Sequence, residues 1–492
     1  MSLSSATLAA TRFGYGPRAG ETPPASAADL MRQLTRAAGT APRFPEGGIA
    51  ARKKEIALLS RMRLTFNRSP QGKDERSKTA YRKAYNARLI GMLTLDEHLR
   101  FVETVMSPNG FHERLAAFWM NHFAVNSTKT AMLRVLVPLY EAEAIRPAMT
   151  GRFADLARRA VLHPAMLLYL DQQRSVGPGS PRGRKAGRGL NENLGRELLE
   201  LHTLGAGAGY TQDDVRNAAL ILTGLGIDRI TQQTTFRADI SEPGERQVFG
   251  GRYGGGSRSL ADIEDMIEDL AADPRTRDHI CRKLVRHFIA DSPPGDVVDA
   301  MVEAWRDSGG LLQAVYQAML DHPRSWSEPG AKAKLPFEFI VSSLRALGAD
   351  EKALMPKPRP FTAAAGGEEM MAGAEPVTAM VPGTDPEPVR YRQVELTVPG
   401  SARLGQPLWR APSPAGFADD MATWITAGQV TERIGWARRA VATFGKGADP
   451  RAFVRSTLAD SARQDTIDTV ARAPNRETGL MLALVSPEFN RR

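Results

Sequence analysis

Hydrophobic residues recur at helical spacing wherever a window of this sequence is long enough to judge, and this periodicity constrains the fold more than any other feature. In HERLAAFWMNHF, residues 112–123, a spacing of 100° per residue gives one face that carries Leu115, Trp119, His122 and Phe123. Similar patterns recur between residues 152 and 443. Alternating patterns, which are typical of strands, are few. The sequence therefore predicts an all-α fold, a large multi-helix globular body.

Capping and turn signals refine this prediction. TQDDVRNAALILTGLGI indicates a helix that begins after Thr211, with Asp214 placed as in a capping box, and that ends before Gly224. Residues 236–253 alternate around a Glu-Pro-Gly turn and predict one small β-hairpin. Residues 391–398 are a second candidate strand.

Residues 356–390 are rich in Pro, Gly, Ala and Glu and poor in large apolar residues. Such a segment cannot bury enough apolar surface to fold alone, so it predicts a flexible linker or long insertion. It separates a main helical body, residues 1–350, from a C-terminal helical part, residues 391–492, that we expect to pack on the main body. A chain of 492 residues is long enough to bury a sizeable core without disulfides.

The formal net charge of +10 is concentrated in two places. Residues 51–88 carry 12 Lys and Arg against 3 Asp and Glu, and residues 172–190 add 5 basic residues and no acid. The first segment indicates two basic helical pieces around a polar turn, with Phe66, Tyr81 and Tyr85 among them. Phosphate binding is one interpretation. A solvated Lys/Arg-rich face is the better supported one, and we do not expect a nucleic-acid partner.

The single cysteine, Cys281, excludes an internal disulfide, and we expect it in the core rather than as a nucleophile. The first 20 residues have neither a charged n-region nor a long apolar run, so we expect no secretory signal and a cytoplasmic location. No stretch approaches the roughly 18 apolar residues that a membrane span needs.

The stretch NENLGRELLELHTLG, residues 191–205, concentrates ionisable residues in a chain with only 8 histidines. On a helical wheel, one flank of its leucine seam carries Asn193, Glu197 and Glu200, and the other flank carries His202. One straight helix therefore cannot turn both carboxylates and the imidazole toward a single ion. They can share a site only if the helix bends before His202 or another segment bridges them.

Two carboxylates beside an apolar seam favour a catalytic site if histidines from other helices stand opposite. Histidines in apolar helical contexts are the natural suppliers, because a charged imidazole is costly there. Such a set suits a divalent metal such as Zn²⁺, Fe²⁺ or Mn²⁺; without metal, the carboxylates suit general acid–base chemistry if burial separates their pKa values. The candidate catalytic residues are Asn193, Glu197 and Glu200, and the candidate metal ligands are His122, His163 and His202.

A purely structural interpretation of the same residues stays open. Glu197 and Glu200 can satisfy arginines such as Arg216 or Arg146, as buried carboxylates usually do. His202 can bind the last carbonyls of its own helix. Glu192 and Arg196, at i and i+4, point outward and are expected to pair.

Two helical segments, residues 114–125 and 279–290, both place a His-Phe pair near their ends. This gives His122 and His287 matching positions. The echo suggests an internal duplication but does not establish one.

Five strings together resemble a known family: FWMNHF, HPAMLLYLD, NENLGRELLELHTLG followed by GYTQDDV, CRKLVRHFIAD and LGQPLWRAPSPAGF. They resemble the bacterial domain-of-unknown-function 1800 family, over nearly the whole chain from about Thr7 to Arg492. The resemblance implies a predominantly helical fold with no established activity. It also implies that many relatives are exported and encoded beside a sulfatase-like family. This chain departs from the family in its missing export signal, its 356–390 insertion, and Ser241 and Glu242 near a Pro-Gly turn where a histidine is expected.

Two functional hypotheses follow from different classes. The first is a metal- or carboxylate-assisted hydrolase with its site in a helical cleft. The second is a non-catalytic accessory or scaffold protein, in which the Trp409 region docks a partner, with the sulfatase-like protein as the candidate. The sequence does not indicate the substrate or the oligomeric state.

Overall fold

The computed structural model describes residues 3–186, 189–327, 330–359 and 390–492. Their secondary structure is almost entirely helical, as the periodicity predicts. None of the helices in these ranges is both long and apolar enough to span a bilayer. The all-α fold class is therefore confirmed.

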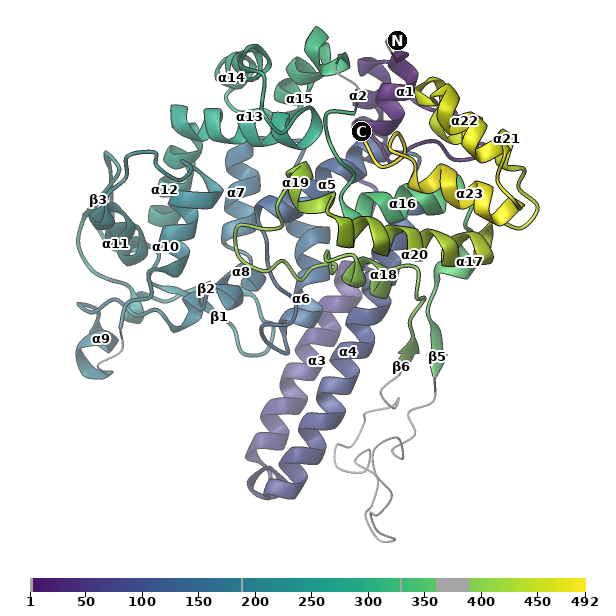
Figure 1. The fold of residues 1–492 in the computed structure, drawn as a ribbon. Coiled ribbons are helices and arrows are strands. Elements are labelled where there is room, and N and C mark those ends of the chain that lie inside the picture. The colour runs from purple at the N-terminus through teal and green to yellow at the C-terminus, as the bar shows by residue number, and fades with distance from the viewer. Residues whose placement is uncertain (1–2, 187–188, 328–329, 360–389) are drawn as a thin grey trace, which may run out of the picture.

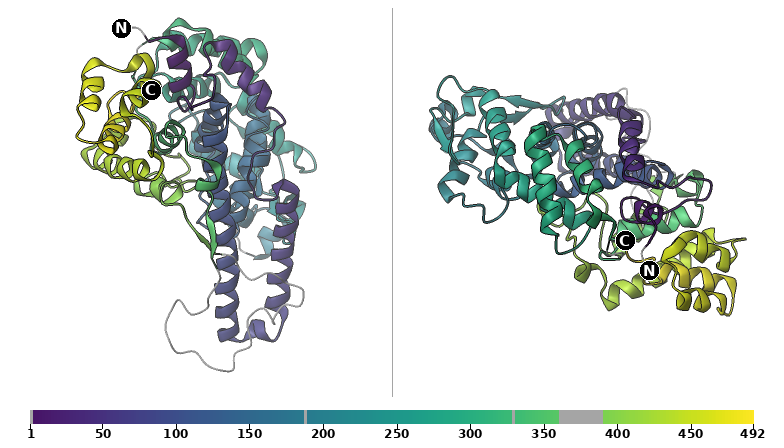
Figure 2. Two further views of the ribbon diagram at one scale, coloured as in Figure 1. Left: turned by 90° about the vertical axis from the view of Figure 1, so that its right-hand side faces the viewer. Right: turned by 90° about the horizontal axis from the view of Figure 1, so that it is seen from above.

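A long helical hairpin projects from the body of the molecule (Figures 1 and 2). Its second helix has 32 residues, or about 48 Å at the usual rise of an α-helix. Asp74 accepts a hydrogen bond from the Ser77 N–H and so caps the start of that helix. The N-terminal elements are α1 (Ser5–Thr11), α2 (Ala27–Ala37), α3 (Gly48–Arg68), the 3₁₀ turn η1 (Gln71–Lys73) and α4 (Glu75–Met106).

The middle of the chain forms a cluster of shorter helices beside the hairpin (Figure 1). Two of its segments are π-helical, a geometry that often marks functional positions. These are η2 (Glu141–Ile145) and η4 (Leu198–His202). The helices are α5 (Gly110–His122), α6 (Leu133–Tyr140), α7 (Phe153–Val161), α8 (Pro164–Tyr169), α9 (Pro181–Ala186), α10 (Asn193–Glu197), α11 (Gln212–Ile221), α12 (Ala261–Ala272), α13 (Pro274–Phe288), α14 (Gly295–Ser308) and α15 (Leu312–Asp321), with the 3₁₀ turns η3 (Gln172–Arg174), η5 (Ala238–Ile240) and η6 (Pro323–Trp326).

The C-terminal helices gather on one side of the body, where α23 packs against α20, α21 and α22, and α20 contacts α16 (Figure 2). Asp449 and Asn475 cap the starts of two of them. The elements are α16 (Pro336–Ala346), α17 (Glu351–Leu354), α18 (Val398–Arg403), α19 (Met421–Trp424), α20 (Ala427–Phe444), α21 (Pro450–Leu458), the 3₁₀ turn η8 (Ala459–Ser461), α22 (Gln464–Ala471) and α23 (Arg476–Val485).

Among the described residues, the strands form three two-stranded antiparallel sheets where the sequence predicts one hairpin. The pairs are β1 (Leu225–Ile227) with β2 (Thr234–Phe236), β3 (Arg246–Val248) with β4 (Gly251–Tyr253), and β5 (Lys357–Arg359) with β6 (Arg390–Arg392). The predicted hairpin turns at Phe249 and Gly250 rather than at the Glu-Pro-Gly sequence. Both residues have positive φ, 48° and 94°, which is what a tight two-residue hairpin requires.

Two apolar clusters hold these elements together. The larger one includes Trp119, Phe123 and Leu198 and joins α5 to the helices of the middle part. The second unites the C-terminal helices with Tyr15 and with Phe101 of α4. Most of the insertion predicted at residues 356–390 lies outside the described residues; its two ends pair as β5 and β6. The proposed division at residues 350 and 391 stays a prediction.

Candidate functional site

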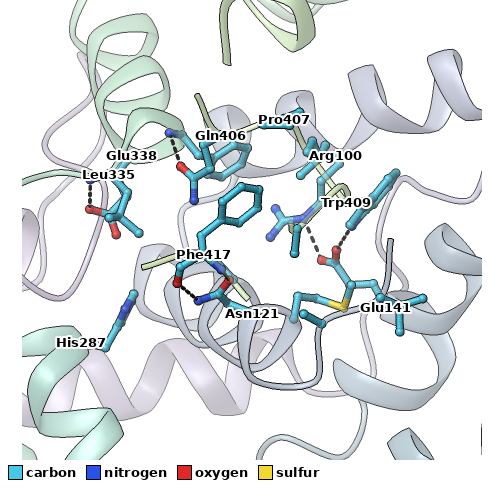
Figure 3. A pocket seen from close by; sticks show the side chains of 17 residues that line it. Arg100, Asn121, Glu141, His287, Leu335, Glu338, Gln406, Pro407, Trp409 and Phe417 are labelled. Carbon is cyan, nitrogen blue, oxygen red and sulfur yellow. Dashed lines mark hydrogen bonds and ion pairs between the residues drawn. The ribbon is translucent and has the colours of Figure 1, made fainter. Parts of the chain in front are cut away.

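A cavity with a volume of about 90 Å³, the central cavity, lies between α4, α5, α16 and the segment 406–417 (Figure 3). Ala117, Met120 and Val125 form part of its apolar wall, together with Leu408 and Phe417. Charged side chains stand at its two ends (Figure 3). Segments from distant parts of the chain therefore meet at one site.

At one end, four charged residues form a buried network. Glu113 receives hydrogen bonds from Arg100 at 3.0 Å and from Arg146 at 2.5 Å. The Nε of Arg100 lies 2.7 Å from Oε1 of Glu141, and the Trp409 indole donates to Oε2 of Glu141 at 2.7 Å. Burial alone would raise the pKa of Glu113, but Arg146 and His112 hold that pKa well below its usual range. Glu113 is thus ionised, and both carboxylates are paired with arginines.

At the other end, His287 joins a second network. Its Nδ1 lies 2.7 Å from Oδ2 of Asp419, and its Nε2 lies 3.3 Å from an amino group of Arg114. Burial lowers the pKa of His287 to about 4, so the imidazole is neutral at pH 7. It therefore donates from Nδ1 to Asp419 and accepts at Nε2 from Arg114. Glu338 completes this network through Arg114 at 2.9 Å and Arg492 at 2.9 Å.

Two amide side chains fasten the cavity wall. Asn121 donates to the Phe417 carbonyl at 3.0 Å and accepts from the Phe417 N–H at 2.8 Å (Figure 3). Gly416 makes this approach feasible, because it has φ of 83° and an added Cβ would lie 2.4 Å from the Asn121 carbonyl oxygen. Gln406 accepts from the Phe337 N–H at 2.9 Å. Among the described residues, its amide nitrogen has no hydrogen-bond partner, so it offers a donor near the cavity.

This arrangement is suited to binding rather than to proton transfer. A general base needs a lone pair that can reach substrate. At His287 the Nε2 lone pair faces Arg114, and the cavity carboxylates are bound by arginines or by the Trp409 indole. The unfilled part of the cavity is the apolar wall.

The structure brings two of the three predicted metal ligands together. The rings of His122 and His202 lie 5.9 Å apart, and His279 adds a third ring 6.4 Å from His122. Burial lowers the pKa of His202 to about 3 and that of His279 to about 4, and the nearby charge of Lys283 acts in the same direction. Neither ring nitrogen of His202 makes a hydrogen bond of normal geometry within the described structure. The predicted bond to its own helix end is therefore not formed.

The two helices that carry a His-Phe pair near their ends, α5 and α13, lie side by side. Arg114 at the start of α5 lies 3.3 Å from His287 near the end of α13, whereas His122 at the end of α5 lies beside His279. The two helices therefore run antiparallel along a seam of basic and imidazole side chains.

His163, the third predicted metal ligand, lies in a different place. Its Nε2 is 3.1 Å from Oε1 of Glu143, and its Nδ1 accepts from the Ala165 N–H at 3.1 Å as the cap of α8. Both ring nitrogens are thus already engaged. Within the described residues, His163 makes no contact with His122 or His202.

The predicted catalytic residues lie where α10 changes to the π-helical turn η4. Asn193 is exposed, and Glu197 and Glu200 are half-buried. Burial and the charge of Glu200 raise the pKa of Glu197, and burial together with Glu200 raises the pKa of Tyr210. Within the described parts of the chain, neither carboxylate forms an ion pair. This separates them from the paired carboxylates of the cavity.

The arginines that the structural interpretation assigned to these carboxylates bind other partners. Arg146 pairs with Glu113 and Glu141, and Arg216 pairs with Glu192 at 3.9 Å. Glu192 also pairs with Arg196 at 3.6 Å, as the helical wheel predicts. Across the described ranges, no group of three or more His, Cys, Asp and Glu side chains is placed to hold a metal ion.

Sequence reasoning missed Arg100, Glu141 and Gln406, and it did not assign His287 or Asn121 to the site. A signal for the charged residues exists, because Arg100 directly precedes Phe101 and Glu141 directly follows Tyr140, and both charged residues are 1% exposed. A charge on an apolar face requires a buried partner. Which distant charge supplies that partner depends on tertiary packing.

The family comparison covers almost the entire chain. A family model described as a protein of unknown function, DUF1800, matches residues 8–491. Searches found no matching curated protein and no matching solved structure. The resemblance carried by the five sequence strings is thereby confirmed, and the chain belongs to the DUF1800 family of proteins of unknown function.

Proposed function

We propose that this protein is a non-catalytic accessory protein whose central cavity receives an aliphatic side chain of a partner polypeptide. One observation carries the proposal: the charged groups at both ends of the cavity bind other protein groups, while the apolar wall between them is unfilled. Paired charges hold the walls in place. An unfilled apolar wall gains free energy when an apolar group covers it.

The size of the cavity supports a side chain rather than a free substrate. A volume of about 90 Å³ corresponds to about three waters at roughly 30 Å³ each. Small-molecule sites usually measure about 300–1,000 Å³. One leucine-sized group fits the smaller space. Binding energy at protein interfaces is concentrated in such anchor pockets.

Gln406 supplies a polar contact for the same partner. Its amide nitrogen can donate to a backbone carbonyl that accompanies the anchoring side chain, while Oε1 stays bound to the Phe337 N–H. Trp409 forms the adjoining wall and is held by Glu141. The site therefore combines an apolar anchor with one directional hydrogen bond.

The first partner to test is the sulfatase-like protein that the family resemblance suggests. Isothermal titration of the two purified proteins should show binding, and Ala117→Leu, which fills the cavity, should weaken that binding at least tenfold. Ala57→Leu is the matched control, because Ala57 is likewise half-buried but lies on α3 and does not line the cavity. Equal weakening by both variants, or none by Ala117→Leu, contradicts the cavity as the anchor site. Absence of any binding contradicts this partner.

A second candidate function, carboxylate-assisted hydrolysis, is favoured by Glu197 and Glu200. The pair is half-buried, no arginine of the described structure forms an ion pair with it, and the pKa of Glu197 is raised by burial and by Glu200. General acid–base chemistry needs one protonated and one ionised carboxyl, and the raised pKa of Glu197 makes this residue the candidate acid. Asn193, on the same flank, would orient the substrate.

A panel of p-nitrophenyl acetate, phosphate, sulfate and glucoside tests this second candidate. Activity on any one of them should fall at least 100-fold in Glu197→Gln and in Glu200→Gln. Glu192→Gln should keep it, because Glu192 belongs to the Arg-paired outer face of the same helix. Activity that survives both inner substitutions removes the carboxylate mechanism.

The metal-assisted version requires a separate measurement. Elemental analysis of the purified protein should detect a bound divalent metal that is lost in a variant in which Asn replaces His122 and His202. A variant with His163 replaced is a useful comparison for the double variant, because His163 lies apart from the other two histidines. A protein without stoichiometric metal, or a variant with unchanged content, contradicts this version.

A further inference from the structure

A second cavity lies beside the π-helical turn η2 and has a volume of about 260 Å³. The turn supplies Glu141 to the first cavity and Glu143 to the second. The second cavity is bounded by α3, α6, the junction of α7 with α8, and the turn between β1 and β2. The two cavities share no lining residue, so an inference about the second does not rest on the function proposed for the first.

The floor of this cavity is apolar and its inner polar groups are fully paired. Ile56, Leu136 and Leu139 form much of the floor. Glu143 binds Lys53 at 2.6 Å and His163 at 3.1 Å. Burial alone would raise the pKa of Glu143, but hydrogen bonds from His163 and Lys53 keep that pKa below its usual value. The inner wall thus offers no unpaired charge.

The rim is rigidly built. Asp228 accepts hydrogen bonds from the backbone N–H groups of Ile230 and Thr231, at 3.0 and 2.7 Å, and shapes the β1–β2 turn. Thr234 ties the turn to α7 by donating to the Leu162 carbonyl at 2.6 Å. Gln232 has a positive φ of 52°, a conformation that costs energy in a non-glycine residue.

Arg159 is a cation at the rim whose guanidinium can bind an anionic ligand. It lines the cavity from the end of α7, and within the described residues it has no ion-pair or hydrogen-bond partner. Its neighbours Arg152 and Arg158 both pair with carboxylates. The side-chain amide of Gln233 is also without a hydrogen-bond partner in the described structure. With Lys53, Arg159 and Glu143, the cavity has one net positive charge.

We propose that this second cavity binds a small organic carboxylate, with its apolar body on the Leu136–Leu139 floor and its carboxylate on Arg159. A guanidinium binds a carboxylate through two parallel hydrogen bonds, which a neutral group cannot match. A volume of about 260 Å³ has room for a carboxylate that carries a single aromatic ring. Benzoate is therefore a suitable probe, and benzamide is its neutral isostere.

Titration of the full chain with benzoate, benzamide and inorganic sulfate, followed by ligand-observed NMR, tests the proposal. Benzoate should bind saturably and at least tenfold more tightly than benzamide or sulfate. Arg159→Gln should weaken benzoate binding at least tenfold, because a charge-assisted contact is lost. Arg152→Gln, an exposed arginine on the same segment that does not line the cavity, should change nothing.

A third variant tests the contribution of the cavity floor to benzoate binding separately from that of the rim. Ala144→Leu should abolish benzoate binding, because Ala144 lines the cavity. Equal affinities for benzoate and benzamide overturn the proposal, as does benzoate binding unchanged by Arg159→Gln. Sulfate binding as tight as benzoate binding also overturns it, because the floor would then contribute nothing. The Arg159 result decides the question even if Ala144→Leu does not fold.

Discussion

The centre of the molecule and the far end of the α3–α4 hairpin are both rich in charge, but they handle it in opposite ways. In the centre, Arg100, Glu113 and Arg146 are 1–7% exposed and paired within ion-pair distance. At the hairpin, exposed cations have no ion-pair partner among the described residues; these are Arg61, Arg68, Lys73, Arg76, Arg82 and Lys83. Charged side chains are thus buried and paired in the centre, whereas at the hairpin they are exposed to solvent.

This difference indicates where substitutions will be costly. A buried pair gains little net stability over an apolar replacement, but removing one partner leaves a desolvated charge and costs about 3–5 kcal/mol. An exposed charge costs about 0–1 kcal/mol to remove. The protein should therefore be sensitive to single substitutions at the cavity and insensitive to them at the hairpin surface.

The largest effect is expected for Glu113→Gln. Two buried arginines would lose their shared carboxylate, so the free energy of unfolding should fall by about 3–5 kcal/mol in urea denaturation. Glu75→Gln is the matched control at the hairpin. Glu75 is 79% exposed and, within the described residues, forms an ion pair with Lys78 alone, so its removal should cost at most about 1 kcal/mol. Similar losses of unfolding free energy in the two variants would contradict the difference between the centre and the hairpin.

The second-largest effect is expected on acidification, which should destabilise the buried centre of the protein. Burial lowers the pKa of His202 to about 3 and of His279 and His287 to about 4, whereas an unfolded chain has a value of about 6.5. The unfolded state then binds more protons, so the stabilisation is complete above pH 6.5 and is lost as pH falls toward 4.

His202→Leu sharpens this prediction. The stability–pH slope between pH 6 and 4.5 should decrease by about one proton, because one neutral buried imidazole is removed. Stability at pH 7 should change little, because His202 makes no hydrogen bond of normal geometry within the described residues. An unchanged slope in urea titrations at several pH values would show that His202 does not resist protonation.

A smaller, local effect is expected for Phe66→Ala. Phe66 is 4% exposed and stacks on Tyr81 with centroids 4.0 Å apart, and Tyr81 stacks in turn on Tyr85. Loss of this stack should let the hairpin end open, so amides near residues 60–85 should exchange at least tenfold faster. Amides of α5 should keep their protection. Uniformly faster exchange would show that hairpin and centre unfold together.

The aromatic stack also illustrates what the sequence predicted. Local patterns predicted the two basic helical pieces, the α5 face and the Thr211 cap, because each depends on neighbours within about one turn. Phe66, Tyr81 and Tyr85, which the sequence left among basic residues as a feature of phosphate binding, instead pack between the two helices. Their burial follows from the pairing of the helices, which no single window contains.

The candidate site was less predictable for a related reason. Glu197 and Glu200 stood out because several ionisable residues occur close together in the sequence. The cavity residues Arg100, Glu141 and Gln406 are far apart in sequence and come together only through tertiary packing. A local pattern finds clusters along a chain, whereas the partners in a buried network can be far apart in sequence, as are Trp409 and Glu141 at 268 residues.

The smallest effect is expected for the triple variant Arg68→Gln, Lys73→Gln and Arg76→Gln. These exposed side chains have no ion-pair partner in the described structure, so stability should change by less than about 0.5 kcal/mol for each substitution. The aromatic side chains of the segment are buried and cannot stack on bases. We therefore expect the unmodified protein to show no measurable binding to duplex DNA at about 150 mM salt. Tight binding that falls steeply with salt and disappears in the triple variant would instead make the hairpin a phosphate-binding surface, because each lost contact reduces the salt dependence.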